Sequence, residues 1–279
     1  MTIPEERWLA EIRSRPECEP LVRGSYFDAD LGSAWDRFCE SAEFQEVEHI
    51  LQSNGDPKVI LDLGAGRGIA SYAFSRNPAR TVIALEPDAS RELGRGALYQ
   101  IPKERRVSVI EGAGEDIPLP NNSVDAVYAR QVLHHARDLR GMMREVSRVL
   151  QPGGLFLACR EHVVSSRRQL EQFLRNHDTH RWTCNEHAYR VEEYTEAIVG
   201  AGLTLKAQWG PWESLLNAYP ALSSAEDLSR CEEIFLSRKF GATGRQLARV
   251  RFIRRAYRVW LNRPTPGRLF SFLATKPAA

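Results

Sequence analysis

The sequence predicts an α/β fold built on a mostly parallel sheet, and three observations support this prediction. Short apolar runs alternate with segments of helical spacing from residue 58 onward. The first of these runs leads directly into a turn rich in glycine. The chain of 279 residues, 43% of them hydrophobic, is long enough to bury a core without disulfide bonds. Strands that alternate with helices at this spacing form βαβ units, in which helices cover both faces of the sheet.

The first segment, residues 1–55, is expected to form a helical cap. Ser33 is a candidate N-cap for a helix from Ala34 to about Gln52, along which apolar residues recur at roughly helical spacing. Asn54-Gly55-Asp56-Pro57 should end this helix, because glycine and proline interrupt regular structure.

The core is expected to cover residues 56–212 and to alternate strands with helices. The predicted strands are 59–63, 80–85, 107–110, 124–129, 155–159 and 203–209. The predicted helices are 69–76, 89–99, 139–150 and 191–201. Residues 213–264 are expected to form a mostly helical insertion, and residues 265–279 a final strand and tail. This order places the insertion between the last two strands of the sheet.

The composition favours a reduced, cytoplasmic protein. The five cysteines are widely spaced and form no CxxC pair, which indicates neither a disulfide framework nor a zinc site. No stretch approaches roughly 18 apolar residues, so neither a membrane-spanning helix nor a membrane partner is expected. The first residues lack an apolar run behind a basic start, so they do not resemble a signal peptide. The net charge of +2 favours no particular partner and leaves the oligomeric state open.

A glycine turn and an acidic residue indicate an adenosine site. Gly64, Gly66 and Gly68 follow a predicted strand and open a predicted helix, where glycines let the backbone approach a ligand closely. Glu86 ends the second predicted strand, 20 residues after Gly66, where a carboxylate accepts hydrogen bonds from both ribose hydroxyls. An ordinary strand–helix turn is the alternative for the glycines alone. NAD and S-adenosylmethionine both fit this spacing, although Ile69 leaves the dinucleotide pattern GxGxxG incomplete.

Several sequence blocks together favour S-adenosylmethionine over NAD. They are LDLGAGRG at 61–68, ALEPD at 84–88, EGAGEDIPLPNNSVD at 111–125, VLHH at 132–135 and RVLQPGG at 148–154. With these blocks the chain resembles the class I S-adenosylmethionine-dependent methyltransferases, in the small-molecule, type 11-like subgroup, over about residues 58–161. The resemblance implies a Rossmann-like sheet, mostly parallel with an antiparallel last strand. It also implies S-adenosylmethionine as the methyl donor and S-adenosylhomocysteine as the product.

The resemblance further implies which residues bind the cofactor. The methionine portion would face Asp62, Gly64, Ala65 and Gly66, and the ribose would face Glu86, with Pro87 beside it. The adenine would lie at Gly114, Glu115 and Asp116, and the methionine amino group at the backbone of Arg130 and Gln131. The family usually carries an aspartate–alanine pair where this chain has Ala113-Gly114. A side-chain contact to the adenine amino group is therefore missing or moved to Asp116.

His134, His135 and Glu161 are the candidate catalytic residues. The histidine pair follows the fourth predicted strand, where the ligand crevice of an open α/β sheet lies. Methyl transfer is an in-line displacement, and a histidine has a suitable pKa to take the proton of a hydroxyl acceptor. Resemblance to sugar and small-molecule O-methyltransferases implies this role, with an acidic residue near the end of the fifth strand assisting. The alternative is that the histidines only pack at the start of a helix.

A second polar cluster follows the core strands. It contains His177, Asp178, His180, Cys184, Glu186, His187 and Tyr189. These residue types bind metals, but their spacing matches no standard ligand pattern, so no metal is predicted. A substrate-facing loop is expected here, and plain surface polarity is the alternative.

Three functions are compatible with the sequence. The favoured one is methylation of a small molecule, as O-methylation of a carbohydrate or secondary metabolite. An RNA methyltransferase acting on tRNA or rRNA is an alternative, because the stretch from Arg245 to Arg258 is basic. Apolar residues recur among these arginines at helical spacing, so we interpret the stretch as an amphipathic helix and expect no nucleic-acid partner. A non-catalytic S-adenosylmethionine-binding protein is the third possibility, since folds do not determine functions.

Overall fold

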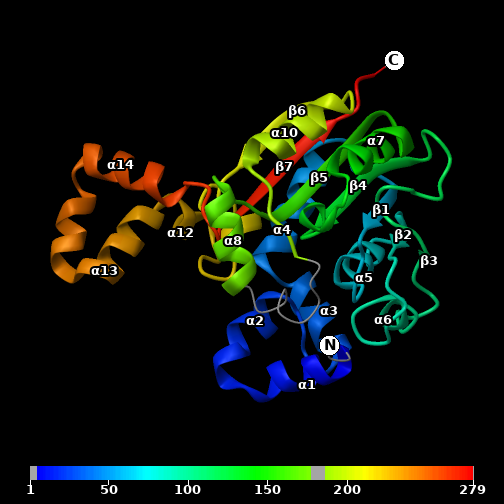
Figure 1. Cartoon of the computed structure of the whole chain (residues 1–279), viewed down its shortest axis with the longest axis horizontal. Coiled ribbons are helices and arrows are strands. Elements are labelled where there is room, and N and C mark those ends of the chain that lie inside the picture. Colours follow the sequence, from blue (N-terminus) through cyan, green and yellow to red (C-terminus); the bar gives the residue numbers. More distant parts are fainter. Residues whose placement is uncertain (1–4, 177–185, 279) are drawn as a thin grey trace.

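A computed structural model describes residues 5–176 and 186–278 of the chain. Within these residues lies a seven-stranded sheet with the order β3-β2-β1-β4-β5-β7-β6 (Figure 1). Its strands are β1 (Val59–Leu63), β2 (Thr81–Leu85), β3 (Val107–Ile110), β4 (Val124–Arg130), β5 (Leu150–His162), β6 (Thr204–Trp209) and β7 (Leu269–Thr275). The first five strands pair in parallel, whereas β7 lies antiparallel between β5 and β6. The predicted mostly parallel sheet with an antiparallel last strand is therefore confirmed.

Helices pack on both faces of this sheet, which explains the continuous apolar runs in the strands. These helices are α4 (Ala42–Ser53), α5 (Ile69–Ser75), α6 (Arg95–Leu98), α7 (Leu139–Val149) and α10 (Val191–Gly200). Helix α8 (Arg167–Asn176) instead packs in a separate small cluster with Val164 and Ala188. On one face, Leu61 of β1 joins a buried cluster with Met143 of α7 and Tyr194 of α10. On the other face, the neighbouring Ile60 joins a cluster with Phe74 of α5. Successive strand residues point to opposite faces, so β1 is buried from both sides.

The N-terminal cap is helical as expected, but its long helix is broken. The cap contains α1 (Glu5–Ser14), a 3-10 turn (Pro16–Cys18), α2 (Glu19–Gly24) and α3 (Leu31–Cys39), and α4 follows it. The predicted single helix from Ala34 to Gln52 is wrong, because Ser41 adopts an extended conformation and caps α4 by accepting a hydrogen bond from Phe44 N. The predicted N-cap Ser33 is also wrong: its backbone N–H donates to Asp30, which caps α3.

Two predicted core elements have different lengths in the structure. The helix predicted at 89–99 shrinks to α6, because the chain before it folds into tight turns. A Cβ on Gly94 would lie 2.3 Å from the carbonyl oxygen of Asp88, a packing that a helix starting at Ala89 would not allow. The strand predicted at 155–159 is the longer β5, which extends to Glu161 and His162. That extension brings both polar side chains to the carboxyl end of the sheet.

The predicted helical insertion between the last two strands is confirmed. It contains α11 (Leu215–Ala218), α12 (Ala225–Ser229), α13 (Cys231–Ala248) and α14 (Arg251–Leu261), which lie in sequence between β6 and β7. In Figure 1, α13 and α14 extend away from the sheet as an arm. None of the helices in the described parts of the chain is both long and apolar enough to cross a membrane.

Candidate active site

A cavity of about 930 Å³ opens at the carboxyl ends of β1, β2, β4 and β5, where open α/β sheets bind their ligands. Most of the predicted site residues line it: Asp62, Gly64, Ala65, Gly66, Glu86, Pro87, Gly114, Glu115, Arg130, Gln131, His134 and His135. The two others, Asp116 and Glu161, do not line it. The cap contributes Leu21, Ser25 and Phe27 to the cavity wall, a contribution that no sequence pattern indicated.

The glycine turn and Glu86 are joined by hydrogen bonds. Gly66 N donates to Oε2 of Glu86 at 2.7 Å, and Asp88 N donates to Oε1 at 2.9 Å. Gly64 has a φ of +64°, and a Cβ there would lie 2.7 Å from Cγ2 of Val132, so only glycine fits. Burial raises the pKa of Glu86 despite these hydrogen bonds. The turn therefore holds a carboxylate at the cavity wall, in the position proposed for a ribose.

Asp62 lies at the end of β1 and is 2% exposed. Its Oδ2 accepts a hydrogen bond from Ser71 Oγ at 2.5 Å. Burial outweighs this hydrogen bond and raises the pKa of Asp62 to about 7. A buried carboxylate at a cavity wall favours a ligand that brings positive charge or hydrogen-bond donors, as the methionine portion of the expected S-adenosylmethionine would.

The proposed adenine end is built by Gly114 and Glu115. A Cβ on Gly114 would lie 2.6 Å from Cε of Met142, so a larger residue would displace that side chain. Oε1 of Glu115 accepts a hydrogen bond from Arg137 N at 2.9 Å and so ties the segment to the loop after β4. Asp116 is exposed, and its backbone N–H donates to Ala113 O at 3.1 Å. A contact between Asp116 and an adenine remains a prediction.

Arg130 connects the cavity to helix α4. Its guanidinium donates to the buried Glu43 of α4 at 2.6 and 3.1 Å. A second guanidinium, that of Arg160, lies 3.5 Å from the same carboxylate. Burial alone would lower the pKa of Arg130, but Glu43 outweighs it and raises the pKa. The next residue, Gln131, has a φ of +57° and donates its N–H to Cys159 O, so the loop after β4 turns sharply at the cavity.

Glu161 fixes the position of the histidine loop, the segment after β4 that carries His134 and His135. This fully buried carboxylate at the end of β5 accepts hydrogen bonds from Val132 N at 3.0 Å and from His134 N at 3.1 Å. It also lies 2.7 Å from Nδ1 of His134. The structure therefore brings together His134 and Glu161, which the sequence predicted as partners.

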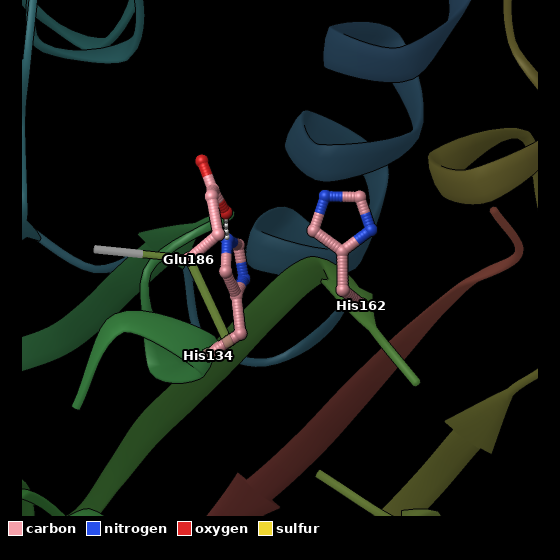
Figure 2. A group of neighbouring side chains, drawn as sticks. All are labelled: His134, His162 and Glu186. Carbon is pink, nitrogen blue, oxygen red and sulfur yellow. Dashed lines mark ion pairs between the residues drawn. The ribbon is translucent and has the colours of Figure 1, made fainter. Parts of the chain in front are cut away.

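The opposite edge of the His134 ring lies near a second carboxylate, that of Glu186. The ring Nε2 lies 3.4 Å from Oε2 of Glu186, which precedes α10 (Figure 2). Burial alone would lower the pKa of His134, but the hydrogen bonds to Glu161 and Glu186 outweigh it and raise the pKa to about 9. The rings of His135 and His162 lie 4.2 and 4.7 Å from the ring of His134, centroid to centroid.

The polar cluster predicted after the core strands is only partly described. His177, Asp178, His180 and Cys184 lie outside the described residues. Glu186 lines the cavity, and Tyr189 donates its hydroxyl hydrogen to Ala136 O at 2.7 Å, next to the histidine loop. The sequence did not assign a role to His162, which also lines the cavity. Its position directly after Glu161 at a strand end was the available signal.

Comparison with known proteins identifies the domain. The family model described as a methyltransferase domain matches residues 61–158. The uncharacterized methyltransferase YcgJ of Bacillus subtilis is 33% identical over 121 residues, which cover 42% of this chain and 46% of YcgJ. The dimethylglycine N-methyltransferase of Parasynechococcus marenigrum is 34% identical over 118 residues, covering 39% of this chain and 41% of the relative. The chain thus spans less than half the length of these curated relatives.

Solved structures share the fold at low sequence identity. The Bacillus subtilis YcgJ structure superposes with a TM-score of 0.53 at 20% identity, covering 85% of this chain and all of YcgJ. A geranyl diphosphate methyltransferase in complex with S-adenosylmethionine superposes with a TM-score of 0.56 at 17% identity, covering 92% and 95% of the two chains. Fold, cavity and family match together define a class I methyltransferase domain, the class whose methyl donor is S-adenosylmethionine. Within that class, residues 61–158 match the model of the type 11-like methyltransferase domain.

Proposed function

We propose that the chain binds S-adenosylmethionine in this cavity and transfers its methyl group to a small molecule. The observation that carries the proposal is that one cavity joins two chemically different halves. One half contains the glycine turn, Asp62 and Glu86, which suit a nucleoside and an amino acid. The other half contains His134 and His135, which suit a polar acceptor.

Methyl transfer from a sulfonium depends more on aligning the acceptor with the methyl group than on activating the donor. A lone pair of the acceptor attacks the methyl carbon, the carbon–sulfur bond breaks, and the sulfonium becomes the thioether of S-adenosylhomocysteine. The acceptor proton leaves to a nearby base or to water. The protein contributes mainly by holding the two reactants in line. His134 and His135 line the same cavity as the glycine turn, which supports them as our candidates for the acceptor side. With a pKa of about 9, His134 suits positioning or charge stabilisation better than taking the acceptor's proton.

We favour O-methylation of a carbohydrate or secondary metabolite, because histidine side chains gather at the acceptor half. The named relatives methylate other atoms and molecules: dimethylglycine on nitrogen, and sterols and ubiquinone or menaquinone precursors on carbon. A geranyl diphosphate methyltransferase is among the structural neighbours. The acceptor panel for a test should therefore contain dimethylglycine, a sterol, a demethylated menaquinone, geranyl diphosphate, a catechol and a hexuronic acid.

The test separates cofactor binding from methyl transfer. Titration calorimetry should show S-adenosylhomocysteine binding that Glu86→Ala weakens by about 10- to 100-fold, since a charged hydrogen-bond acceptor is lost. The exposed Glu104→Ala should leave binding unchanged. The double variant His134→Ala/His135→Ala should keep binding but lose about 100-fold or more in turnover with the acceptor that wild type accepts.

Each outcome decides a separate point. No binding of S-adenosylhomocysteine by the wild-type protein would reject the proposal. Binding without turnover on any member of the panel would favour the non-catalytic alternative. Undiminished turnover in the double variant would remove both histidines from the mechanism.

A further inference from the structure

Three side chains from distant parts of the sequence meet at one end of the cavity. His134 comes from the loop after β4, His162 from the end of β5, and Glu186 from the segment before α10 (Figure 2). One nitrogen or carboxylate oxygen of each lies within 4.8 Å of the others. His134 and Glu186 are buried, and His162 is half-buried. Two imidazoles and one carboxylate are a ligand set that zinc and other first-row metals accept.

The distances agree with a shared ion. Metal–nitrogen and metal–oxygen bonds are about 2.0–2.2 Å long, so two ligand atoms on a tetrahedral ion lie about 3.4 Å apart. Nε2 of His134 and Oε2 of Glu186 are 3.4 Å apart. The three ligand atoms lie within 4.8 Å of one another, so the widest of their separations would shorten by at most about 1.4 Å on binding. His162, the half-buried member of the group, is the ligand that would move, by a change in its side-chain torsions.

Glu161 supplies the support that metal-binding histidines usually have. A ligating imidazole commonly donates its second N–H to a carboxylate, which holds the ring and its tautomer. Glu161 lies 2.7 Å from Nδ1 of His134, on the side of the ring away from Glu186. This arrangement leaves Nε2 as the ligand atom. Glu161 would therefore act as a positioning residue and not as a ligand.

The charges also favour a cation. Glu161 is completely buried and Glu186 is 8% exposed, and both carboxylates contact the same imidazole ring. Two negative charges in a poorly hydrated site are costly unless positive charge compensates them. A protonated His134 would compensate only one of these charges, whereas a divalent ion between Glu186 and the two histidines would compensate both.

We propose that His134, His162 and Glu186 bind one divalent first-row transition-metal ion, with zinc as the first candidate. Three protein ligands leave a coordination position for a further group, as in catalytic zinc sites. Since all three ligands line the cofactor cavity, that position would face the acceptor half. The ion would then select an oxygen-bearing acceptor and polarise it. Only this last role rests on the proposed function, because the binding site stands on its own geometry.

Metal content tests the site directly. Full-length protein is stripped with EDTA, reloaded separately with zinc, manganese or iron(II), and desalted, and bound metal is measured by mass spectrometry. Wild type should retain about one equivalent of at least one ion. His162→Ala and Glu186→Gln should retain less than about a tenth of an equivalent, and Glu161→Gln should lower the affinity about 10- to 100-fold. The exposed His49→Ala is the matched control and should bind like wild type.

Cobalt(II) spectroscopy covers the case in which a ligand variant folds poorly. Cobalt-loaded wild type should show visible absorption from a nitrogen- and oxygen-ligated ion, and zinc should displace it. Failure of wild type to bind any of the four ions, or full retention by both His162→Ala and Glu186→Gln, would overturn the metal site.

S-adenosylhomocysteine binding is measured on the same samples. Metal binding without cofactor binding would reject the proposed function alone, and the reverse result would reject the metal site alone.

Discussion

At the residue scale, Asp62 illustrates the conflict between stability and ligand binding. Its carboxylate is buried at the cavity wall with Ser71 as its hydrogen-bond donor, and its pKa is raised from 3.8 to about 7. An unfolded aspartate loses its proton near pH 4, whereas the folded one holds it until about pH 7. The stability that the protonated form provides is therefore lost as pH rises through this window, and the loss is complete above about pH 7.

Asp62→Asn should stabilise the unliganded protein at high pH and weaken cofactor binding. We expect the free energy of unfolding to rise by about 1–3 kcal/mol at pH 8, with no gain near pH 4, because the amide has no charge to bury. Affinity for S-adenosylhomocysteine should fall about tenfold or more. Denaturant unfolding at both pH values and calorimetry measure these effects. The exposed Asp36→Asn is the control and should change neither, and a less stable Asp62→Asn at pH 8 would contradict the interpretation.

At the scale of elements, Arg67 attaches the N-terminal cap to the glycine turn. Its guanidinium donates hydrogen bonds to the backbone oxygens of Tyr26 at 2.5 Å, Asp28 at 2.8 Å and Glu92 at 2.9 Å. Its own carbonyl accepts a hydrogen bond from Trp35 Nε1 at 3.0 Å. The cap segment held in this way includes the cavity-lining Phe27. One side chain in the turn therefore sets the position of a wall of the cavity.

Arg67→Met should loosen the cap without unfolding the sheet. The substitution leaves three carbonyl oxygens without their charged donor, which we expect to cost roughly 2–4 kcal/mol of local stability. Hydrogen exchange of residues 21–30 should accelerate, whereas exchange in β1 and β4 should stay slow. The exposed Arg23→Ala in α2 is the matched control. Unchanged exchange in the cap of Arg67→Met would show that other contacts hold it.

At the scale of the whole molecule, positive charge is concentrated at one end of the chain. No acidic residue follows Glu233, while arginines and lysines continue through α13 and α14 to Arg268 and Lys276, which flank β7. Part of this charge has a structural role, since Arg254 and Arg258 pair with the buried Glu232. Arg251 and Arg255 are exposed on the arm.

This charge distribution makes nucleic-acid binding testable. We expect no binding of tRNA or rRNA fragments in fluorescence anisotropy at low salt, because some of the basic residues are already paired within the protein. The charge-reversal variant Arg251→Glu/Arg255→Glu should then match wild type in cofactor binding and in turnover of a small acceptor. RNA binding that weakens steeply with salt and disappears in this variant would instead support the RNA methyltransferase alternative.

Much of the half of the cavity proposed for the cofactor could be predicted from the sequence, because its residues lie in short, ordered blocks. Local hydrophobic patterns predicted the strands, and the glycine turn with Glu86 predicted an acidic side chain at the cavity 20 residues away. The sequence did not predict that Asp30 and Ser41 are the N-caps of α3 and α4, nor the close packing around Gly94. These features depend on hydrogen bonds and contacts that a periodic pattern does not contain.

By itself, the sequence determined the sheet and the class of domain, and most of the site residues that it predicted line the cavity. Only the tertiary structure decided how the acceptor half is built. It placed the Glu161 carboxylate against Nδ1 of His134, and it brought His162 and Glu186 close to the imidazole ring of His134. It also paired Arg130 with Glu43, which lies 87 positions away in the sequence. The physical reason is that spacing along a chain predicts neighbours within one strand or helix. Contacts between elements depend on how those elements pack, and packing brings together side chains that share no local pattern.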